Sequence, residues 1–300
     1  MKNENPAPMT DAEMTEKLKK LERANLVILP LIIIGIAAGI VTWLVSSDIR
    51  FGLIVFFVIV AAAILIGRVI DNKKKKLINS HFGEYFAKRK AEVFGEPMHT
   101  PEFVIDADSI KKSKLIDTDF NGGSASGLYE GICKNHHFSA ANAYLTYSFD
   151  ERPGSEDSMS RTVTILDGFV LTLETRTKPD GEVRLRARCT DEKGGIRTEN
   201  DEFNSRFFIT ADSETDAFRL LTPNFMELIF GLEKLTKGKL AGLRWSGNTI
   251  TMALNTKYRF GEVPPELYTP DADFVRKTFD ASLESMEKII VHLTTNTALF

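Results

Sequence analysis

Cysteine is scarce in this sequence. The 300 residues include only two cysteines, Cys133 and Cys189, and neither stands in a paired motif such as C-x-x-C. Two cysteines are too few for the disulfide framework of a small secreted domain. We therefore expect both thiols to be reduced, in a domain that faces the cytosol.

Recognisable catalytic motifs are also lacking. The sequence contains neither a Walker phosphate-binding loop nor a G-x-G-x-x-G dinucleotide motif. Gly122–Gly127 reads GGSASG, which is not the G-x-S-x-G of a nucleophile elbow, and no helical pattern follows it. We interpret this segment as a flexible turn, and we predict no catalytic residue.

Candidate metal ligands are few. His136 and His137 lie beside Cys133 on a predicted hairpin. Adjacent residues on a strand point to opposite faces, so the two histidines are not expected to bind one ion. Cys133 and His137 can share a face, but two ligands are too few for a structural zinc site. We predict no metal and no cofactor.

Acidic residues gather in predicted loops, without the twelve-residue ligand spacing of a calcium-binding EF-hand. We expect their carboxylates to face water. The clusters are Asp117 and Asp119; Asp150, Glu151, Glu156 and Asp157; Asp191 and Glu192; and Glu199, Asp201 and Glu202.

Basic charge is concentrated before residue 97. Residues 1–96 contain 14 Lys and Arg against 10 Asp and Glu, a net charge of +4, whereas the remainder contains 24 against 31, a net of −7. Duplex binding needs a clustered basic face. Nucleic acid is therefore not an expected partner.

Long hydrophobic runs are what the sequence does contain, and both lie near its N-terminus. Leu26–Val45 has no charged residue, and Phe51–Ile70 has one, Arg68, near its end. A helix of about 20 residues rises about 30 Å, the thickness of the hydrocarbon core of a bilayer. Only five residues separate the runs. We predict an antiparallel two-helix transmembrane hairpin over residues 26–70.

Basic flanks predict the orientation of this hairpin. Lys17, Lys19, Lys20 and Arg23 stand shortly before the first run, a basic cluster ends the second, and the connecting loop holds one basic residue, Arg50. Because positive flanks stay in the cytoplasm, both termini are expected to be cytoplasmic. The cluster that ends the second run is predicted to lie at the membrane surface, against anionic headgroups. Its members are Arg68, Lys73, Lys74, Lys75 and Lys76.

Local signals surround the hairpin. Thr10 and Glu13 form a capping box for an amphipathic helix within residues 1–25, which we expect to lie on the membrane or to continue the first span. Pro30 is expected to kink or break the helix. Gly35 and Gly39 permit close helix packing, inside the hairpin or between copies of the chain.

Residues 71–96 are predicted to continue the second helix outward from the membrane. Ile78, Phe82, Phe86 and Val93 recur at near-helical spacing, and Gly95 and Pro97 end the pattern. We expect this juxtamembrane helix to hold the following domain close to the membrane.

Residues 97–300 are predicted to form one soluble α+β domain with an antiparallel sheet and packed helices. β-Branched and aromatic runs between turn residues predict the strands. Capping residues followed by helical spacing predict the helices, the last of which packs on the sheet or against a partner helix. The predicted strands are Phe103–Ile105, Leu128–Lys134, Phe138–Phe149, Thr162–Asp167, Phe169–Thr175, Glu182–Thr190, Leu240–Trp245 and Thr249–Leu254. The helices begin at Asp212 or Ser213, at Thr222–Pro223 and at Thr269–Pro270, and the last carries Phe279, Leu283, Met286, Ile290 and Leu293 on one face.

Three segments give the sequence a family likeness. They are TDFNGGSASGLYEGICKNHHFSAANAYLTYS, ILDGFVLTLE and DEFNSRFFITADSETDAFRLLTPNFMELIF, and they follow a lysine-flanked double span. This order resembles the bacterial domain-of-unknown-function 3137 family from about Lys76 onward, most strongly over Phe203–Phe230. Phe203 and Phe207 are interpreted as anchors of one strand. The resemblance implies a protein of the bacterial cytoplasmic membrane, with a LemA-type membrane protein as a candidate partner, and it implies no activity.

Three functions follow as hypotheses. The first is a non-enzymatic membrane-anchored scaffold or protein-interaction module, whose partners besides the lipid bilayer are a second copy of the chain or another membrane protein. The second is a lipid- or ligand-sensing module at the membrane surface. The third is an unrecognised hydrolase that uses loop acids or Cys133.

Overall fold

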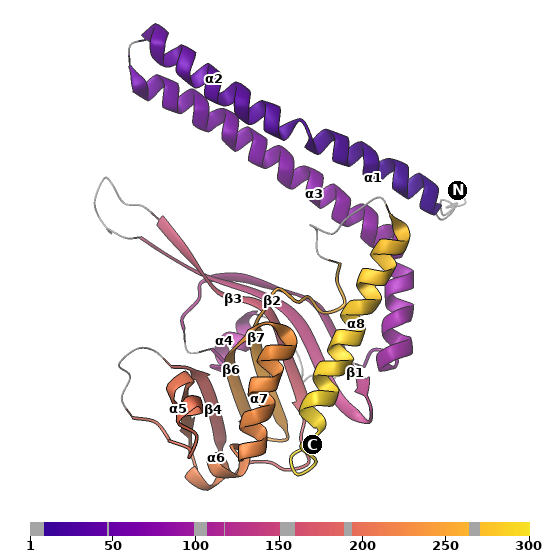
Figure 1. Ribbon diagram of the computed structural model, residues 1–300, viewed down its shortest axis with the longest axis vertical. Coiled ribbons are helices and arrows are strands. Elements are labelled where there is room, and N and C mark those ends of the chain that lie inside the picture. Colours follow the sequence, from indigo (N-terminus) through magenta and orange to yellow (C-terminus); the bar gives the residue numbers. More distant parts are fainter. Residues whose placement is uncertain are drawn as a thin grey trace, which may run out of the picture. The chain divides into compact units, whose positions relative to one another are not determined.

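The computed structural model describes residues 9–46, 48–98, 107–116, 118–150, 160–188, 194–263 and 271–300. The chain divides into two compact units, one comprising Met1–Lys88 with Val263–Phe279, the other Arg89–Glu262 with Asp280–Phe300. The first contains long apolar helices and the second a seven-stranded sheet with its helices (Figure 1). The predicted α+β class is confirmed. The predicted division into residues 1–25, 26–70, 71–96 and 97–300 stays a prediction.

Helix α1 (Asp11–Asn25) begins at the predicted capping box. The Thr10 hydroxyl accepts a bond from the backbone N–H of Glu13, whose carboxylate accepts one from the N–H of Thr10. Helix α2 (Ile28–Ser46) follows after a two-residue turn. Pro30 lies in the first turn of α2, where a backbone N–H has no intrahelical partner to lose. The predicted break is confirmed, but it precedes the proline.

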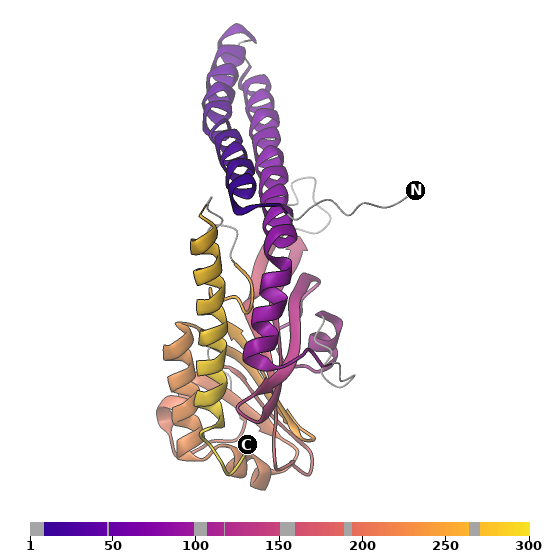
Figure 2. The same ribbon diagram turned by 90° about the vertical axis from the view of Figure 1, so that its right-hand side faces the viewer.

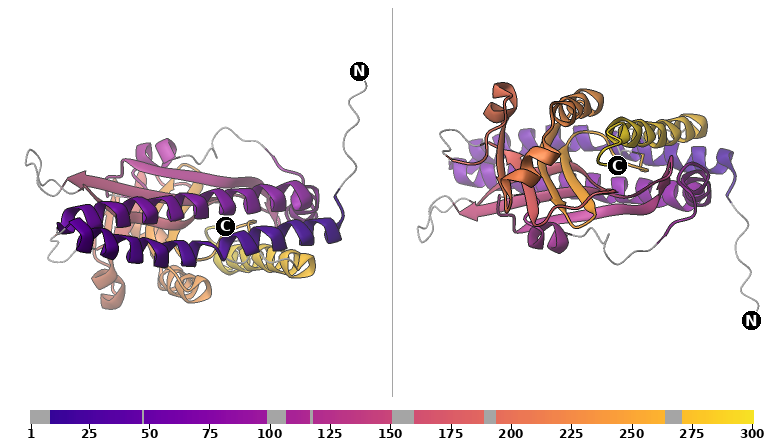
Figure 3. Two further views of the ribbon diagram at one scale, coloured as in Figure 1. Left: turned by 90° about the horizontal axis from the view of Figure 1, so that it is seen from above. Right: turned by 90° about the horizontal axis from the view of Figure 1, so that it is seen from below.

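Helices α2 and α3 (Ile49–Phe94) form an antiparallel pair, seen from above in Figure 3. The helical stretches Asp11–Ser46 and Ile49–Phe94 each contain a segment that is long and apolar enough to span a membrane. Large apolar side chains on this pair face outward, and those of Leu29 and Phe57 are 66% and 62% exposed. Such outward-facing apolar residues are typical of helices that contact lipid.

The two helices approach each other most closely at glycines. A Cβ atom on Gly39 would lie 2.9 Å from the carbonyl oxygen of Gly52, and one on Gly52 would lie 3.0 Å from the Cβ of Trp43. Gly35 lies against Ile59 in the same way, with 3.0 Å to its Cγ2. The small-residue pattern predicted from Gly35 and Gly39 therefore serves packing inside the hairpin.

Helix α1 is tied to other helices of the first unit by ion pairs. Asp11 accepts a hydrogen bond from His81 of α3 at 2.7 Å and one from Arg276 of α8 (Ala272–Thr294) at 2.9 Å. These two partners, His81 first, lower the pKa of Asp11. Met14 and Leu18 are 0% and 1% exposed. Of the two expected alternatives, the structure shows the helix that continues towards the first span, with its apolar face buried in protein.

The second unit is built on one antiparallel sheet whose strand order is β1-β2-β3-β7-β6-β4-β5. Three of the strand pairs contain a register shift, and among the described residues β1 and β5 form the two edges. The strands are β1 (Gly122–Cys133), β2 (His136–Asp150), β3 (Ser160–Glu174), β4 (Glu182–Ala187), β5 (Phe207–Ala211), β6 (Lys239–Ser246) and β7 (Thr249–Asn255).

Helices cover both faces of this sheet. Helix α7 (Pro223–Thr236) and residues 280–294 of α8 lie on one face, and α4 (Ala107–Lys112) lies on the other (Figures 2 and 3). The α8 residues Leu283, Met286, Ile290 and Leu293 are at most 1% exposed. The predicted packing of this helix face inside the domain is therefore confirmed. Its predicted start at Thr269–Pro270 lies outside the described residues.

Several predicted elements need correction. Thr162–Asp167 and Phe169–Thr175 are one strand, because Gly168 has no Cβ to collide with the Leu254 carbonyl of β7. GGSASG is not a turn but the start of β1, where Gly127 has a φ of +66° at a register shift. Phe203 lies on the short helix α5 (Asp201–Arg206), capped by Asn200, and only Phe207 belongs to β5.

Other predicted elements agree with the structure. Ser213 caps α6 (Glu214–Leu220), and Thr222 caps α7 with Pro223 in its first turn. Gly95, with a φ of +77°, follows the last residue of α3. Phe103–Ile105 and the end of the predicted strand at Cys189 and Thr190 lie outside the described residues.

Candidate functional site

The predicted membrane-surface residues lie along α3. Arg68, Lys73, Lys75 and Lys76 are exposed, whereas Lys74 is only 8% exposed. Successive residues on a helix are rotated by about 100°, so four consecutive lysines cannot all face one surface. Lys74 is the one that faces protein. The sequence pattern could not reveal this, because the burial depends on the packing of the first unit. The membrane-surface role of the cluster stays a prediction.

Cys133 and the adjacent histidines flank a two-residue turn. Lys134 and Asn135 have φ values of 48° and 68°, which two-residue hairpin loops require. This turn pairs Cys133 with His136 and Ile132 with His137. Cross-strand partners share a face of the sheet, so the predicted shared face of Cys133 and His137 is wrong. The prediction failed because it counted sequence separation along one strand and not across the turn.

The Cys133 thiol is buried, at 2% exposed. Burial, followed by the charge of Glu287, raises its pKa to about 11. Glu287 itself forms an ion pair with Lys134 at 3.0 Å. A catalytic cysteine must ionise readily, and such cysteines lie in electropositive, accessible surroundings. The surroundings of Cys133 therefore favour an inert structural thiol.

A second polar cluster lies on the opposite face of the same strands. The His137 ring lies 3.0 Å from the Glu130 carboxylate and 3.7 Å from that of Glu174. Glu130 is 5% exposed, and the His137 ring is a close polar neighbour of its carboxylate. Across the described ranges, no three His, Cys, Asp or Glu side chains are arranged to hold a metal ion. We assign this cluster to packing of the sheet.

The structure describes only some members of the acidic loop clusters. Asp201 and Glu202 lie in the first turn of α5, where negative charge stabilises a helix. Asp119 is exposed, and so are Asp150 and Asp201. Asp117, Glu151, Glu156, Asp157, Asp191 and Glu192 lie outside the described residues.

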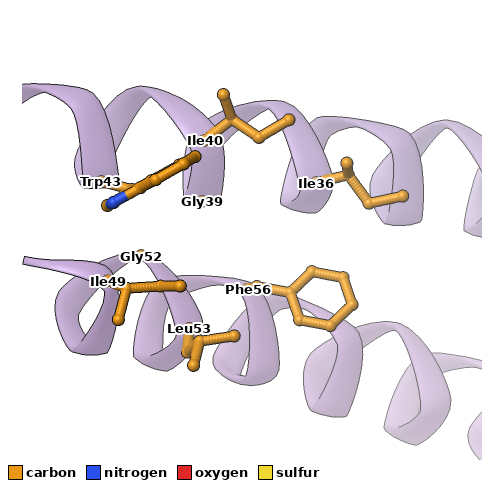
Figure 4. Close-up of a pocket in the computed structure, with 8 residues that line it drawn as sticks. All are labelled: Ile36, Gly39, Ile40, Trp43, Ile49, Gly52, Leu53 and Phe56. Carbon is orange, nitrogen blue, oxygen red and sulfur yellow. The ribbon is translucent and has the colours of Figure 1, made fainter.

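An apolar groove lies between the two long helices near their connecting turn. Its volume is about 300 Å³. Figure 4 shows Gly39 opposite Gly52, with Trp43 and Phe56 on either side. The remaining lining residues are Ile36, Ile40, Ile49 and Leu53. This lining offers no acid, base or nucleophile, and its surface suits contact with hydrocarbon chains.

The strands β2 and β3 continue beyond the rest of the sheet as a two-stranded ribbon. β1 pairs with β2 only as far as Thr146, and β7 pairs with β3 only from Gly168. We call residues 146–150 and 160–164 the ribbon. Beyond Thr146, which also pairs with Gly122 of β1, the described strands of the ribbon pair only with each other, and their registers match Tyr147 with Val163 and Phe149 with Arg161.

The two faces of the ribbon differ, since one carries hydroxyl side chains and the other carries aromatic rings and Val163 together with Arg161. Ser148 and Thr162 share a hydrogen bond of 2.8 Å, and the Asn121 side chain bonds the backbone of Ser148. On the other face, the rings of Tyr147 and Phe149 stack at 5.8 Å. These rings and Val163 are 36%, 37% and 42% exposed. Sequence reasoning placed these residues in strands but missed their exposure, because alternation does not reveal where neighbouring strands end.

Comparisons with known proteins identify a family. No curated protein and no solved structure matches the chain. Residues 164–295 match the family model described as "Protein of unknown function (DUF3137)". This range contains the Phe203–Phe230 segment on which the resemblance chiefly rested, whereas the resemblance predicted from about Lys76 to residue 163 lies outside the match. Residues 164–295, which run from within β3 to just past the end of α8, are therefore similar to the DUF3137 family of proteins of unknown function.

Proposed function

We propose that this protein is a non-enzymatic interaction module anchored in the bacterial cytoplasmic membrane, with both termini and the α+β unit in the cytosol. The two apolar helices support the anchor. The basic flanks, with a single arginine in the connecting loop, support the orientation. The buried, neutral thiol of Cys133 argues against the hydrolase that would use it.

The observation that carries the interaction role is the pair of stacked rings on one face of the ribbon, a face that Arg161 shares. Tyr147 and Phe149 present stacked, half-exposed rings on a segment that has no third strand beside it among the described residues. Aromatic side chains dominate the binding energy of protein interfaces, because each buries a large rigid surface. The candidate partners are a second copy of this chain and another membrane protein, of which the LemA type is one.

The ribbon is expected to lose its partners when its rings are removed. Tyr147→Ser with Phe149→Ser should weaken capture of specific partners by the tagged full-length chain by more than about 30-fold, since truncating each interface aromatic costs about 2 kcal/mol. The measurement is quantitative affinity capture from mild-detergent extracts. Tyr144→Ser, which removes a 46% exposed ring from the paired part of β2, is the control. A wild-type chain that is a monomer without specific partners would contradict the proposal.

A second candidate function, lipid sensing at the membrane surface, is favoured by the exposure of Lys73, Lys75 and Lys76 directly after the second span. Each lysine near an anionic surface contributes about 1 kcal/mol of attraction. Replacing these three with glutamine should abolish enrichment of anionic over neutral lipid around the full-length chain in mixed nanodiscs. The matched control replaces the exposed Lys88, Lys112 and Lys288. Equal enrichment in both triple variants would remove this candidate.

A further inference from the structure

A basic pocket lies in the second unit, between the turn that follows α4 and the strands β4 and β5. Its volume is about 220 Å³. The turn supplies Lys114 and Leu115, β4 supplies Arg184 and Arg186, and β5 supplies Phe208 and Thr210. These residues come from three separate stretches of sequence, and the fold brings them together.

Strand register builds the floor of the pocket. Arg184 pairs with Thr210 and Arg186 with Phe208, so these four side chains share one face of the sheet. The Arg186 guanidinium lies 4.3 Å from the centre of the Phe208 ring. A guanidinium stacked on an aromatic ring keeps its orientation, which favours planar contacts with an anion.

A glycine lets the wall of the pocket approach this floor. Gly242 of β6 pairs with Arg186, and a Cβ at Gly242 would collide with the carbonyl oxygen of Leu115. The turn therefore sits directly on the sheet. Lys114 adopts a left-handed φ of 49°, which only a few non-glycine residues accept. The close contact between the Leu115 backbone and Gly242 therefore holds the neighbouring Lys114 beside β4.

Positive charge exceeds negative charge around the pocket. The Glu182 carboxylate forms ion pairs with Arg184 of the same strand and with Arg244 of β6. Arg244 is the cross-strand neighbour of Arg184, and its guanidinium lies 2.8 Å from Glu182. Glu182 is thus shared by two guanidinium groups. The described lining of the pocket holds Lys114, Arg184 and Arg186 and no acidic residue. The Nε of Arg244 is buried without a hydrogen-bond partner among the described residues, and burial lowers the pKa of that guanidinium.

The geometry points to a phosphate-binding site in this pocket, with Lys114 and Arg184 as its principal ligands. A dianionic phosphate group compensates two positive charges, and guanidinium and ammonium groups form strong charge-assisted hydrogen bonds with its oxygens. The Thr210 hydroxyl is a further donor on the same face. The small volume fits a compact phosphate ester, which is either a soluble metabolite or the headgroup of an anionic lipid. This assignment does not depend on the interaction role of the ribbon.

Calorimetric titration of the full-length chain in neutral detergent tests this site. The soluble probes are inorganic phosphate and glycerol 3-phosphate, and the lipid probes are dihexanoyl phosphatidic acid and dihexanoyl phosphatidylcholine. Binding of a soluble phosphate would identify a metabolite site, whereas preference for phosphatidic acid over both soluble phosphates would identify a headgroup site. Both results support the proposal. If no phosphate probe binds at 10 mM, the proposal is overturned. A dissociation constant of 10 mM corresponds to a binding free energy of about −2.7 kcal/mol.

Two variants locate the ligand. Lys114→Gln and Arg184→Gln are each expected to weaken the affinity about tenfold, because each removes a charge-assisted contact. Lys112→Gln removes the same charge from an exposed position on α4, outside the pocket, and should leave the affinity unchanged. If Lys114→Gln and Lys112→Gln bind phosphate equally well, the pocket is not the site and the proposal fails.

Discussion

Phe94→Ala is expected to lower the free energy of unfolding of the second unit by about 3–5 kcal/mol, the usual cost of truncating a buried phenylalanine. Phe94 is 0% exposed at the end of α3. Its ring lies 5.1 Å from that of Phe138, 5.9 Å from that of Phe260 and 6.3 Å from that of Tyr129. Alanine would leave a cavity at the centre of this aromatic cluster, which its rigid rings cannot readily fill.

The measurement is denaturant unfolding of the full-length chain in detergent, followed by the fluorescence of Trp245. The chain has two tryptophans, Trp43 and Trp245, so a Trp43→Phe background leaves the buried Trp245 as the only reporter. Phe218→Ala removes a ring that is 49% exposed and should change the unfolding free energy by no more than about 0.5 kcal/mol. Equal unfolding midpoints for the two variants would show that the cluster contributes little.

Cys133 is expected to react with thiol reagents about 100-fold more slowly at pH 8 than a cysteine with an unshifted pKa. Burial raises its pKa from 9.0 to about 11. Below that value, the fraction of thiolate falls tenfold for each unit by which the pH is lowered. The rate should therefore keep rising until about pH 11. Since the folded-state pKa lies above the unfolded one, the associated stability is present below pH 9 and is lost as pH rises towards 11.

A Cys189→Ser background isolates this reaction. The rate of disulfide exchange with an aromatic disulfide reagent is measured between pH 7 and pH 11, in native conditions and in denaturant. The denatured chain should react quickly, as an ordinary thiol does. A native rate that levels off near pH 9 would contradict the burial argument and would restore Cys133 as a candidate nucleophile.

Element boundaries set by local bonds were predictable from the sequence. Thr10, Ser213 and Thr222 cap helices through their own hydroxyls, so neighbouring residues alone identify them. Boundaries set by tertiary contacts were not. Gly168 resembles a turn residue in the sequence, but it continues β3 because β7 approaches the backbone there. Phe203 carries a strand-like pattern, yet the Asn200 cap begins a helix.

The candidate sites also differ in how far the sequence could predict them. The lysines after the second span form one run, so the sequence could identify the cluster, although not the burial of Lys74. The phosphate pocket joins Lys114 to Arg184 and Thr210, which are distant in the sequence and meet only through strand register and the close approach at Gly242. The net charge gave no indication of this basic pocket, because the region beyond residue 96 is acidic as a whole.

The two edges of the sheet bear on how copies of this chain associate. β1 contains Gly123 and Gly127 with φ values of +150° and +66°, and its register shifts between Ser126 and Tyr129. β5 has only five residues. Irregular or short edge strands offer a poor template for a further strand, which protects a protein from edge-to-edge aggregation. We expect any self-association to use side-chain surfaces and not extension of the sheet, so the chain should resist fibre growth even when it is crowded in a membrane.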